Sequence, residues 1–320
     1  MVIGLVVHRE VQRRIARATF GRMQCGRTTA RARFLRQVAA ALVACFALFS
    51  ASLAQVPAQI HSRLQTRAVL EAHLHSFSDN NSEREALIRK WFAESGCQDA
   101  NLSEQALDAE LPPNVICVLP GKTREVIVVG AHTDKVERVG DGVIDNWTGA
   151  VLLPALLYSL RAQIRHHTFT FVGFSGEEDG LVGSRSYVEH LSSTQRARIE
   201  AMVNFDSLGL GPTEVWASHA DKALRDALAT VARNSKLPVT VMNPENGATA
   251  DSESFARYHI PRITLHSVTE QTWSILHSPR DKISAIKMDD YYDSYRLIAE
   301  YLAYLDESLK PRTAPKNQEH

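Results

Sequence analysis

Histidines and acidic residues of this 320-residue chain recur directly after short apolar segments. Five groups stand out: His132 with Asp134, Asp145, Glu177 with Glu178, Asp206, and His277 with Asp281. Carboxylates that gather away from lysine and arginine repel one another, so a cluster of them needs a cation. Histidine combined with carboxylate suits zinc, whereas an all-oxygen set suits calcium or magnesium. The residue types therefore predict a metal centre if the fold brings the five groups together.

Each group is weak evidence by itself, because an isolated His-x-Asp or Glu-Glu pair is usually a solvated surface feature. Five groups that follow successive predicted elements are more specific. The sequence contains no His-Glu-x-x-His, no Gly-x-Ser-x-Gly and no P-loop pattern. We therefore expect a metal site assembled from several segments instead of one local motif.

The segments between these groups predict alternating strands and helices. The expected strands are 114–119, 125–130, 168–174, 201–205 and 263–265, and the expected helices are 82–95, 146–164, 181–191, 221–235 and 289–309. A capping box over 82–85 starts the first helix, and the turn Pro120-Gly121 predicts a hairpin of the first two strands. Strand–helix alternation indicates an α/β fold: a three-layer sandwich with a mostly parallel mixed sheet and helices on both faces. Ligands of such sheets bind at the carboxyl ends of strands, where the five groups lie.

The N-terminal segment has the pattern of an export signal. Residues 1–36 contain nine arginines and one acidic residue, Glu10, and residues 38–54 are apolar and end in small side chains. A basic region, an apolar region and small residues before the cut are typical of a secretory signal peptide, here cleaved after Ala54. We therefore expect residues 1–54 to be a signal peptide and the protein to be periplasmic or secreted.

Two alternatives would attach the chain to a membrane. About 17 apolar residues is the lower limit for an uncleaved membrane anchor, and Cys45 lies in a lipobox-like sequence. Met23 is an alternative start. After cleavage, Cys97 and Cys117 would be the only cysteines left, which makes them a disulfide candidate in an oxidising compartment. Two buried thiols are the alternative.

The charge of the exported part excludes one class of partner. The whole chain has 36 basic and 36 acidic residues, and residues 1–36 hold nine basic residues and one acidic residue. The remainder therefore has 27 basic and 35 acidic residues. Because affinity for nucleic acid depends on clustered lysine and arginine, we expect no nucleic-acid partner.

Taken together, the groups resemble the co-catalytic di-zinc exopeptidases, which include bacterial leucyl aminopeptidases, with glutamate carboxypeptidase and glutaminyl cyclase as relatives. The matching segments are 130–134, 145–149, 176–184, 204–209, 251–255 and 277–281, in the family's order. The resemblance implies a phosphorylase/hydrolase-like zinc exopeptidase fold, with a single catalytic domain over residues 55–320. It also implies a peptide or aminoacyl substrate.

The resemblance implies two Zn²⁺ per chain and assigns a role to each matching residue. It places the terminal metal ligands in two pairs, His132 with Glu178 and Asp206 with His277. Asp145 matches the bridging carboxylate, Glu177 the general base, and Asp134 the acid that orients His132. These roles agree with physical chemistry, because a pair of zinc ions needs a bridge and a nearby carboxylate can take a proton from water.

Other residues near these segments carry weaker expectations. Family members often have Asp-His where this chain has Asp251-Ser252, so the role of that histidine is lost, and Asp251 is expected to brace a neighbouring loop. Asn146 is expected to orient backbone at the start of a helix. His266 is expected near the edge of the site.

The leading expectation is an exported zinc aminopeptidase that removes N-terminal residues from peptides. A glutaminyl cyclase-like acyltransferase with one zinc is the second possibility. A carboxypeptidase or dipeptidase is the third, and it would need a basic side chain, such as Arg262 or Arg280, to hold a substrate carboxylate. A non-catalytic binding module would be expected to have lost ligands, and none is missing.

Overall fold

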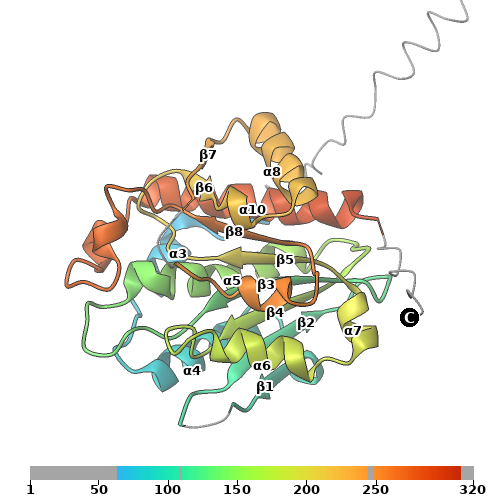
Figure 1. Cartoon of the computed structure of the whole chain (residues 1–320), viewed down its shortest axis with the longest axis horizontal. Helices are drawn as coiled ribbons and strands as arrows, with labels where there is room; N and C mark the ends of the chain where they lie inside the picture. Colours follow the sequence, from blue (N-terminus) through green and yellow to red (C-terminus); the bar gives the residue numbers. More distant parts are fainter. Residues whose placement is uncertain (1–62, 108–109, 244–247, 311–320) are drawn as a thin grey trace, which may run out of the picture. The chain divides into compact units, whose positions relative to one another are not determined.

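A mixed sheet of eight strands lies at the centre of the computed structural model, which describes residues 63–107, 110–243 and 248–310 (Figure 1). The strands are β1 (Leu102–Gln105), β2 (Asn114–Leu119), β3 (Val126–His132), β4 (Thr168–Phe174), β5 (Ile199–Phe205), β6 (Thr213–Val215), β7 (Val239–Val241) and β8 (Arg262–His266). Their order across the sheet is β1-β2-β4-β3-β5-β8-β6-β7. The strands β4, β3, β5 and β8 run parallel to one another, whereas β2 and β6 run antiparallel to their neighbours β4 and β8.

The predicted hairpin of β2 and β3 is wrong, because β4 lies between these two strands and pairs with both. The turn after β2 explains the difference. The backbone N–H groups of Lys122 and Thr123 donate to the carbonyls of Arg165 and His166, which lead into β4. The turn therefore binds the start of β4 instead of folding β2 onto β3, and the buried, apolar β4 takes an interior position in the sheet.

Helices cover both faces of the sheet (Figure 1). One face carries α3 (Arg67–Leu74), α4 (Asn81–Glu94), α5 (Thr148–Leu160), α8 (Lys222–Ser235) and α10 (Met288–Ser308). The other carries α6 (Val182–His190) and α9 (Glu253–Ala256), and the short α7 (Ser193–Ala197) leads into β5. Side chains of β3 alternate between the two layers, with Ile127 and Val129 in the first and Val128 in the second. The predicted three-layer α/β sandwich is confirmed.

The start of α4 differs from the predicted capping box. Asn80 caps the helix, and its side-chain oxygen accepts the backbone N–H groups of Ser82 and Glu83. Glu85 is only 8% exposed and turns inward, so it does not complete a box with Ser82.

The apolar stretch Val143–Leu160 is long and apolar enough to cross a membrane. In this structure 94% of the stretch is buried inside the protein, and it contains α5, which lies between the sheet and the outer helices. It is therefore a core helix in the part of the chain that the structure describes. The signal peptide predicted over residues 1–54 lies outside the described residues.

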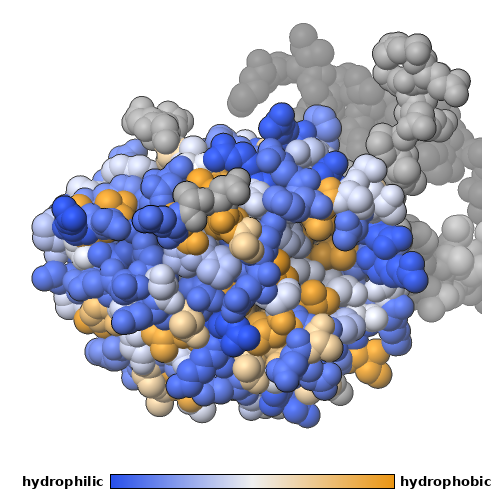
Figure 2. Space-filling view, turned by 90° about the horizontal axis from the view of Figure 1, so that it is seen from below, coloured by the Kyte–Doolittle hydropathy of each residue, from blue (hydrophilic) through white to orange (hydrophobic). Residues whose placement is uncertain are grey.

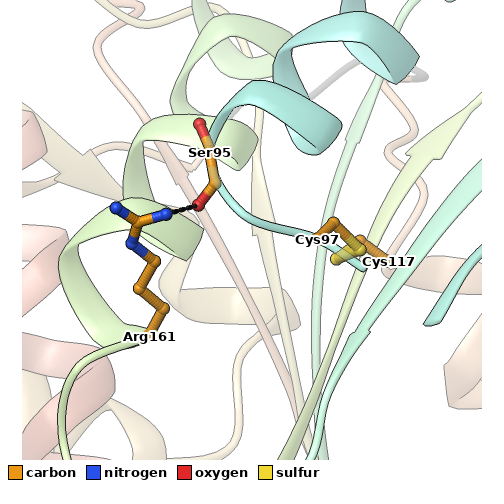
Figure 3. Close-up of a disulfide and its surroundings, with 4 residues drawn as sticks. All are labelled: Ser95, Cys97, Cys117 and Arg161. Atoms are coloured by element: carbon orange, nitrogen blue, oxygen red, sulfur yellow. Dashed lines mark hydrogen bonds between the residues drawn. A yellow bond between two sulfur atoms is a disulfide. The ribbon is translucent and has the colours of Figure 1, made fainter. Parts of the chain in front are cut away.

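A disulfide joins Cys97, just beyond the end of α4, to Cys117 in β2 (Figure 3). The predicted pairing of these two cysteines is confirmed. Close by, the Arg161 guanidinium donates to the Ser95 carbonyl at 2.8 Å. Both contacts attach the C-terminal end of α4 to the rest of the fold.

The surface is mainly hydrophilic on the face drawn in Figure 2, where apolar residues form small, separate groups. The large apolar side chains that are exposed in the described part of the chain are Ile164, Val241 and Trp273. Of these, Trp273 lines the cavity beside the site described below.

Candidate metal centre

The carboxyl ends of three adjacent parallel strands bring the predicted ligands to one edge of the sheet. His132 is the last residue of β3, Glu178 follows β4, and Asp206 follows β5. Asp145 comes from the turn that precedes α5, and His277 from the loop after β8. The five groups of residues singled out in the sequence therefore do converge.

Asp145 stands between the two histidines. One of its carboxylate oxygens lies 3.2 Å from Nε2 of His132, and the other lies 3.1 Å from Nε2 of His277. Asp206 approaches the same nitrogen of His132 at 3.7 Å, and Glu178 approaches that of His277 at 3.1 Å. The side chains thus form two groups of three that share Asp145.

These contacts favour another pairing than the one expected from the sequence. The short contacts join His132 to Asp206 and His277 to Glu178. Glu178 also lies in one group with His132 and Glu177, whose ligand atoms are within 4.8 Å of one another. His132 and Asp206 follow the neighbouring strands β3 and β5, which explains their proximity. The His132 group is the more enclosed, because that side chain is 1% exposed, whereas the His277 side chain is 57% exposed.

The geometry of both groups fits zinc. Two ligand atoms bound tetrahedrally at zinc–ligand distances of about 2.0–2.1 Å lie roughly 3.3 Å from each other. The four nitrogen–oxygen distances around Asp145 fall between 3.1 and 3.7 Å. In addition, Oε1 of Glu178 is buried without a hydrogen-bond partner among the described residues. Imidazole nitrogens and carboxylate oxygens are groups that bind zinc, and a buried carboxylate oxygen without a hydrogen-bond partner is available for a metal.

The electrostatics of the protein groups also indicate a cation. Burial, together with the nearby Asp251, Asp206 and Asp145, raises the pKa of Glu177 to about 10, although His132 opposes this change. Burial also raises the pKa of Glu178 and of Asp206, and the charge of Asp145 adds to both shifts. Carboxylates held so close together ionise readily only when a positive charge joins them.

Asp134 lies against His132, as expected, and makes further contacts. Nδ1 of His132 lies 3.2 Å from the backbone carbonyl of Asp134 and 3.6 Å from its carboxylate. Because a carbonyl only accepts, Nδ1 is the donor and Nε2 is free to face a metal. The carboxylate of Asp134 also accepts the backbone N–H groups of Glu177 and Glu178, each at 3.2 Å. Asp134 therefore positions the Glu-Glu pair as well as His132.

Asn146 has the orienting role that was predicted. Its side-chain oxygen accepts the N–H groups of Gly149 and Ser207, and its side-chain nitrogen donates to the Phe205 carbonyl at 2.8 Å. These three bonds join the start of α5 to the end of β5. They fix the backbone beside Asp145 and Asp206.

Sequence reasoning missed the roles of two buried charged residues. The carboxylate of Asp281 accepts the N–H groups of Ile144 at 2.6 Å and Asp145 at 3.2 Å. Arg84 is fully buried and donates to backbone carbonyls near the site. Two features of the sequence could have drawn attention to them. Asp281 is an aspartate four residues after His277, and Arg84 is a charged residue on the apolar face of α4.

A cavity of about 560 Å³ opens beside the two groups of ligands. Besides the acids and His277, its wall contains Trp216, Thr264, His266, Val268, Trp273 and Leu276. Burial lowers the pKa of His266 to about 4, so this side chain is neutral near pH 7. Its Nε2 donates to the Met242 carbonyl and its Nδ1 accepts the Val268 N–H, which leaves the ring fixed in the wall.

Asp251 and Ser252 mark the departure from the family pattern. Asp251 is fully buried, and burial raises its pKa to about 7. The hydroxyl of Ser252 lies 2.8 Å from that of Thr264 in β8. Ser252 therefore packs against the sheet at the position where family members often carry histidine.

Neither candidate for a carboxylate-binding arginine lines the cavity. Arg262 pairs with Glu253 at 3.2 Å, and Arg280 donates to Ser274. In the described part of the chain, the residues that line the cavity include neither lysine nor arginine.

The chain is similar in sequence to known peptidases. Residues 114–302 match the family described as Peptidase family M28. Leucine aminopeptidase 1 of Ajellomyces capsulatus is 28% identical over 199 residues, which cover 55% of this chain and 51% of that protein. The chain thus spans about half the length of the curated relatives it matches.

Several solved structures share the fold. The LapA aminopeptidase of Legionella pneumophila superposes with a TM-score of 0.69 at 19% identity, covering 80% of this chain and 75% of that one. BSAP, a zinc aminopeptidase from Bacillus subtilis, superposes with a TM-score of 0.56 at 21% identity, covering 62% of this chain and 52% of that one. A glutaminyl cyclase from an Acidobacteriales bacterium superposes with a TM-score of 0.57 at 21% identity, covering 70% of this chain and 85% of that one. The three-layer fold is therefore shared by aminopeptidases and a glutaminyl cyclase.

Proposed function

Because the chain belongs to peptidase family M28, we propose that it is an exported zinc-dependent aminopeptidase that removes N-terminal residues from peptides. The observation that carries the proposal is the carboxylate of Asp145, with one oxygen against His132 and the other against His277. Each histidine has its own second carboxylate. This arrangement supports a bridged centre of two zinc ions, held by Asp145, by His132 with Asp206, and by His277 with Glu178.

Zinc would supply Lewis acidity, which polarises the scissile carbonyl and makes a nearby water easier to deprotonate. Glu177 is then the general base of the reaction. Its carboxylate oxygen lies within 4.8 Å of ligand atoms of His132 and Glu178, and Asp134 holds its backbone. Glu177 takes a proton from water on one carboxylate oxygen and returns it to the leaving amine. A positive charge beside Glu177 also favours the ionised form that this role needs.

The lining of the cavity argues against a carboxypeptidase. Among the described residues its wall contains neither lysine nor arginine, and its carboxylates are those assigned to the zinc ions and to proton transfer. A substrate carboxylate would therefore lack a basic side chain to bind it. Arg262 and Arg280 are bound to Glu253 and Ser274, so neither supplies the missing contact.

A glutaminyl cyclase-like acyltransferase with one zinc is the second candidate. The shared fold with a solved glutaminyl cyclase supports it. The buried set of His132, Asp145 and Asp206 favours the hydrolase, because it gives the centre a second group of three ligands beside that of His277.

The export signal belongs to the same proposal. The disulfide between Cys97 and Cys117 supports folding in an oxidising compartment. We expect the mature protein to begin at Gln55 and to be periplasmic or secreted. Intact mass spectrometry of the protein recovered from the host tests this, and recovery of the whole chain in the membrane, or of a lipid on Cys45, would contradict it.

Hydrolysis of matched substrates tests the proposed activity. The purified protein, loaded with zinc, is expected to cleave leucine p-nitroanilide and to leave its N-acetylated form intact. A chelator should abolish cleavage, and added zinc should restore it. Preference for the acetylated substrate, or for peptides read from the C-terminus, would contradict the aminopeptidase. Release of ammonia from an N-terminal glutamine peptide would favour the cyclase instead.

A further inference from the structure

Arg84 is a fully buried cation that binds backbone carbonyls next to the metal ligands. Its Nε donates to the carbonyl of Thr133, and its Nη2 donates to that of Gly142 at 2.8 Å. Its Nη1 lies 3.3 Å from the carbonyl of Asp141 and 3.4 Å from that of Ser78. Three of these four carbonyls belong to the loop of residues 133–142, which joins His132 at the end of β3 to the turn that carries Asp145.

We propose that Arg84 is a positioning residue for the metal centre, which fixes the spacing between His132 and Asp145. Thr133 directly follows His132, and Gly142 precedes Asp145 by three residues. A guanidinium is planar and holds its donors in a fixed fork, so bonds from one group to the start and the end of this loop set the distance between its two ends. The inference rests on the proposed metal centre.

The two ends of this loop pack closely against each other. Gly142 has a φ of +58°, and a Cβ atom at that position would lie 2.5 Å from Cβ of Lys135. The ring of Trp147 lies 4.9 Å from the Arg84 guanidinium carbon, within the range of a cation–π contact. The Arg84 side chain therefore extends from α4 to the residue that precedes α5 while it binds the loop.

Asp281 holds the same loop from its opposite side. It accepts the N–H groups of Ile144 and Asp145, whereas Arg84 binds the carbonyls of Asp141 and Gly142. The backbone that leads to the bridging carboxylate thus has its carbonyls and its amides bound by side chains of opposite charge. Loss of Arg84 would leave buried carbonyls without partners.

Charge alone is a different explanation, and it can be separated by experiment. Burial lowers the pKa of Arg84 to about 10, against the attraction of Asp134, Asp281, Asp145 and Asp79, so the side chain is charged at neutral pH. Lysine keeps the positive charge but lacks the planar set of donors of a guanidinium group. If Arg84 served only to balance the acids, Arg84→Lys would bind zinc as the original protein does.

The test is a zinc titration against a chromophoric chelator, with the original protein, Arg84→Lys and Arg84→Gln. Arg161→Lys is the control, because Arg161 also donates to a backbone carbonyl, that of Ser95 (Figure 3). Arg161 also contacts an aromatic ring, that of Tyr158. We expect both Arg84 variants to weaken zinc binding by about 10- to 100-fold, and the control to change it less than twofold. Amide hydrogen exchange without metal should quicken over residues 131–134 and 142–145 in the Arg84 variants alone.

Three outcomes would overturn the inference. The first is a folded Arg84→Lys protein with unchanged zinc affinity and unchanged exchange. The second is an equal loss in the Arg161→Lys control. The third is failure of both Arg84 variants to fold, which would give the residue a general structural role. If the original protein itself bound no zinc, the proposed function would fall instead, and the exchange of residues 131–145 would still decide the role of Arg84.

Discussion

Asp134 accepts the backbone N–H of Glu177 at 3.2 Å, and its second carboxylate oxygen accepts that of Glu178 at the same distance. The loop after β3 therefore sets the position of the loop after β4, which carries the proposed base and a proposed ligand. Gly176 allows the chain to turn sharply from β4 into this loop, because its φ is +70° and a Cβ atom there would lie 2.8 Å from a side-chain atom of Leu111.

Replacing Asp134 with asparagine should damage catalysis more than substrate binding. An amide offers one acceptor oxygen instead of two, so one of the two N–H groups of the Glu-Glu pair loses its partner. We expect kcat to fall by about 10- to 100-fold with a smaller change in KM. Steady-state kinetics with an aminoacyl substrate measure this, and Asp179→Asn, an exposed neighbour, is the control. Equal kinetics for the two variants would contradict the positioning role.

Glu177→Gln separates metal binding from proton transfer. Glutamine has nearly the same shape but cannot take a proton from water, so kcat should fall by about three orders of magnitude or more. The zinc content should stay at the level of the original protein, since Glu177 is not a proposed ligand. Full activity in a zinc-loaded Glu177→Gln protein would remove Glu177 as the base.

Glu85 should make stability fall as the pH rises. Burial, followed by the charge of Glu104, raises the pKa of Glu85 to about 7 from an ordinary value near 4.5. Between these two values the folded chain holds a proton that the unfolded chain has released, so the free energy of unfolding falls with increasing pH. Above pH 7 the buried Glu85 carboxyl is ionised, and the full cost of burying its charge lowers the free energy of unfolding.

Glu85→Gln should remove this penalty. After allowance for solvent screening, we expect it to raise the free energy of unfolding by about 1 to 2 kcal/mol at pH 8 and by little at pH 4. Urea denaturation in a chelator at both pH values measures the difference. Glu94→Gln, at an exposed position of the same helix, is the control. A gain that is the same at both pH values would contradict the assignment.

The disulfide should contribute measurably to stability. Cys97 and Cys117 are 20 residues apart, and closing a loop of that length restricts the unfolded chain by about 3 kcal/mol. A variant with serine at both positions should lose that amount in urea denaturation, and reduction of the original protein should give the same loss. A loss far below 1 kcal/mol in both would indicate that the bond adds little to the fold.

The strand ends and the ligand set could be predicted from the sequence because their signals are local. A buried strand such as β4 is a continuous apolar run, and the residues after it must lie at its carboxyl end. The pairing of His132 with Asp206 could not be predicted in this way. It depends on which strands are neighbours, and the order β4-β3-β5 is decided by packing between distant segments.

The short strands at one end of the sheet and the supporting charges were harder to predict for other reasons. β6 and β7 have three residues each, too few for periodicity to identify. Arg84 lies on the same helix as Ile88 and Trp91, four and seven residues further along, at positions that pattern analysis assigns to the core. Only the three-dimensional structure shows that the Arg84 guanidinium donates hydrogen bonds to the carbonyls of residues 133, 141 and 142.

We propose that Asp145 bridges two zinc ions, and the zinc content of the purified protein is the test of this proposal. Elemental mass spectrometry of the original protein and of Asp145→Ala should be run together after loading with zinc. We expect about two zinc ions per chain in the first and far fewer in the second, because without the bridge two cations would repel each other. One zinc per chain in the original protein, or an unchanged content in Asp145→Ala, would contradict it.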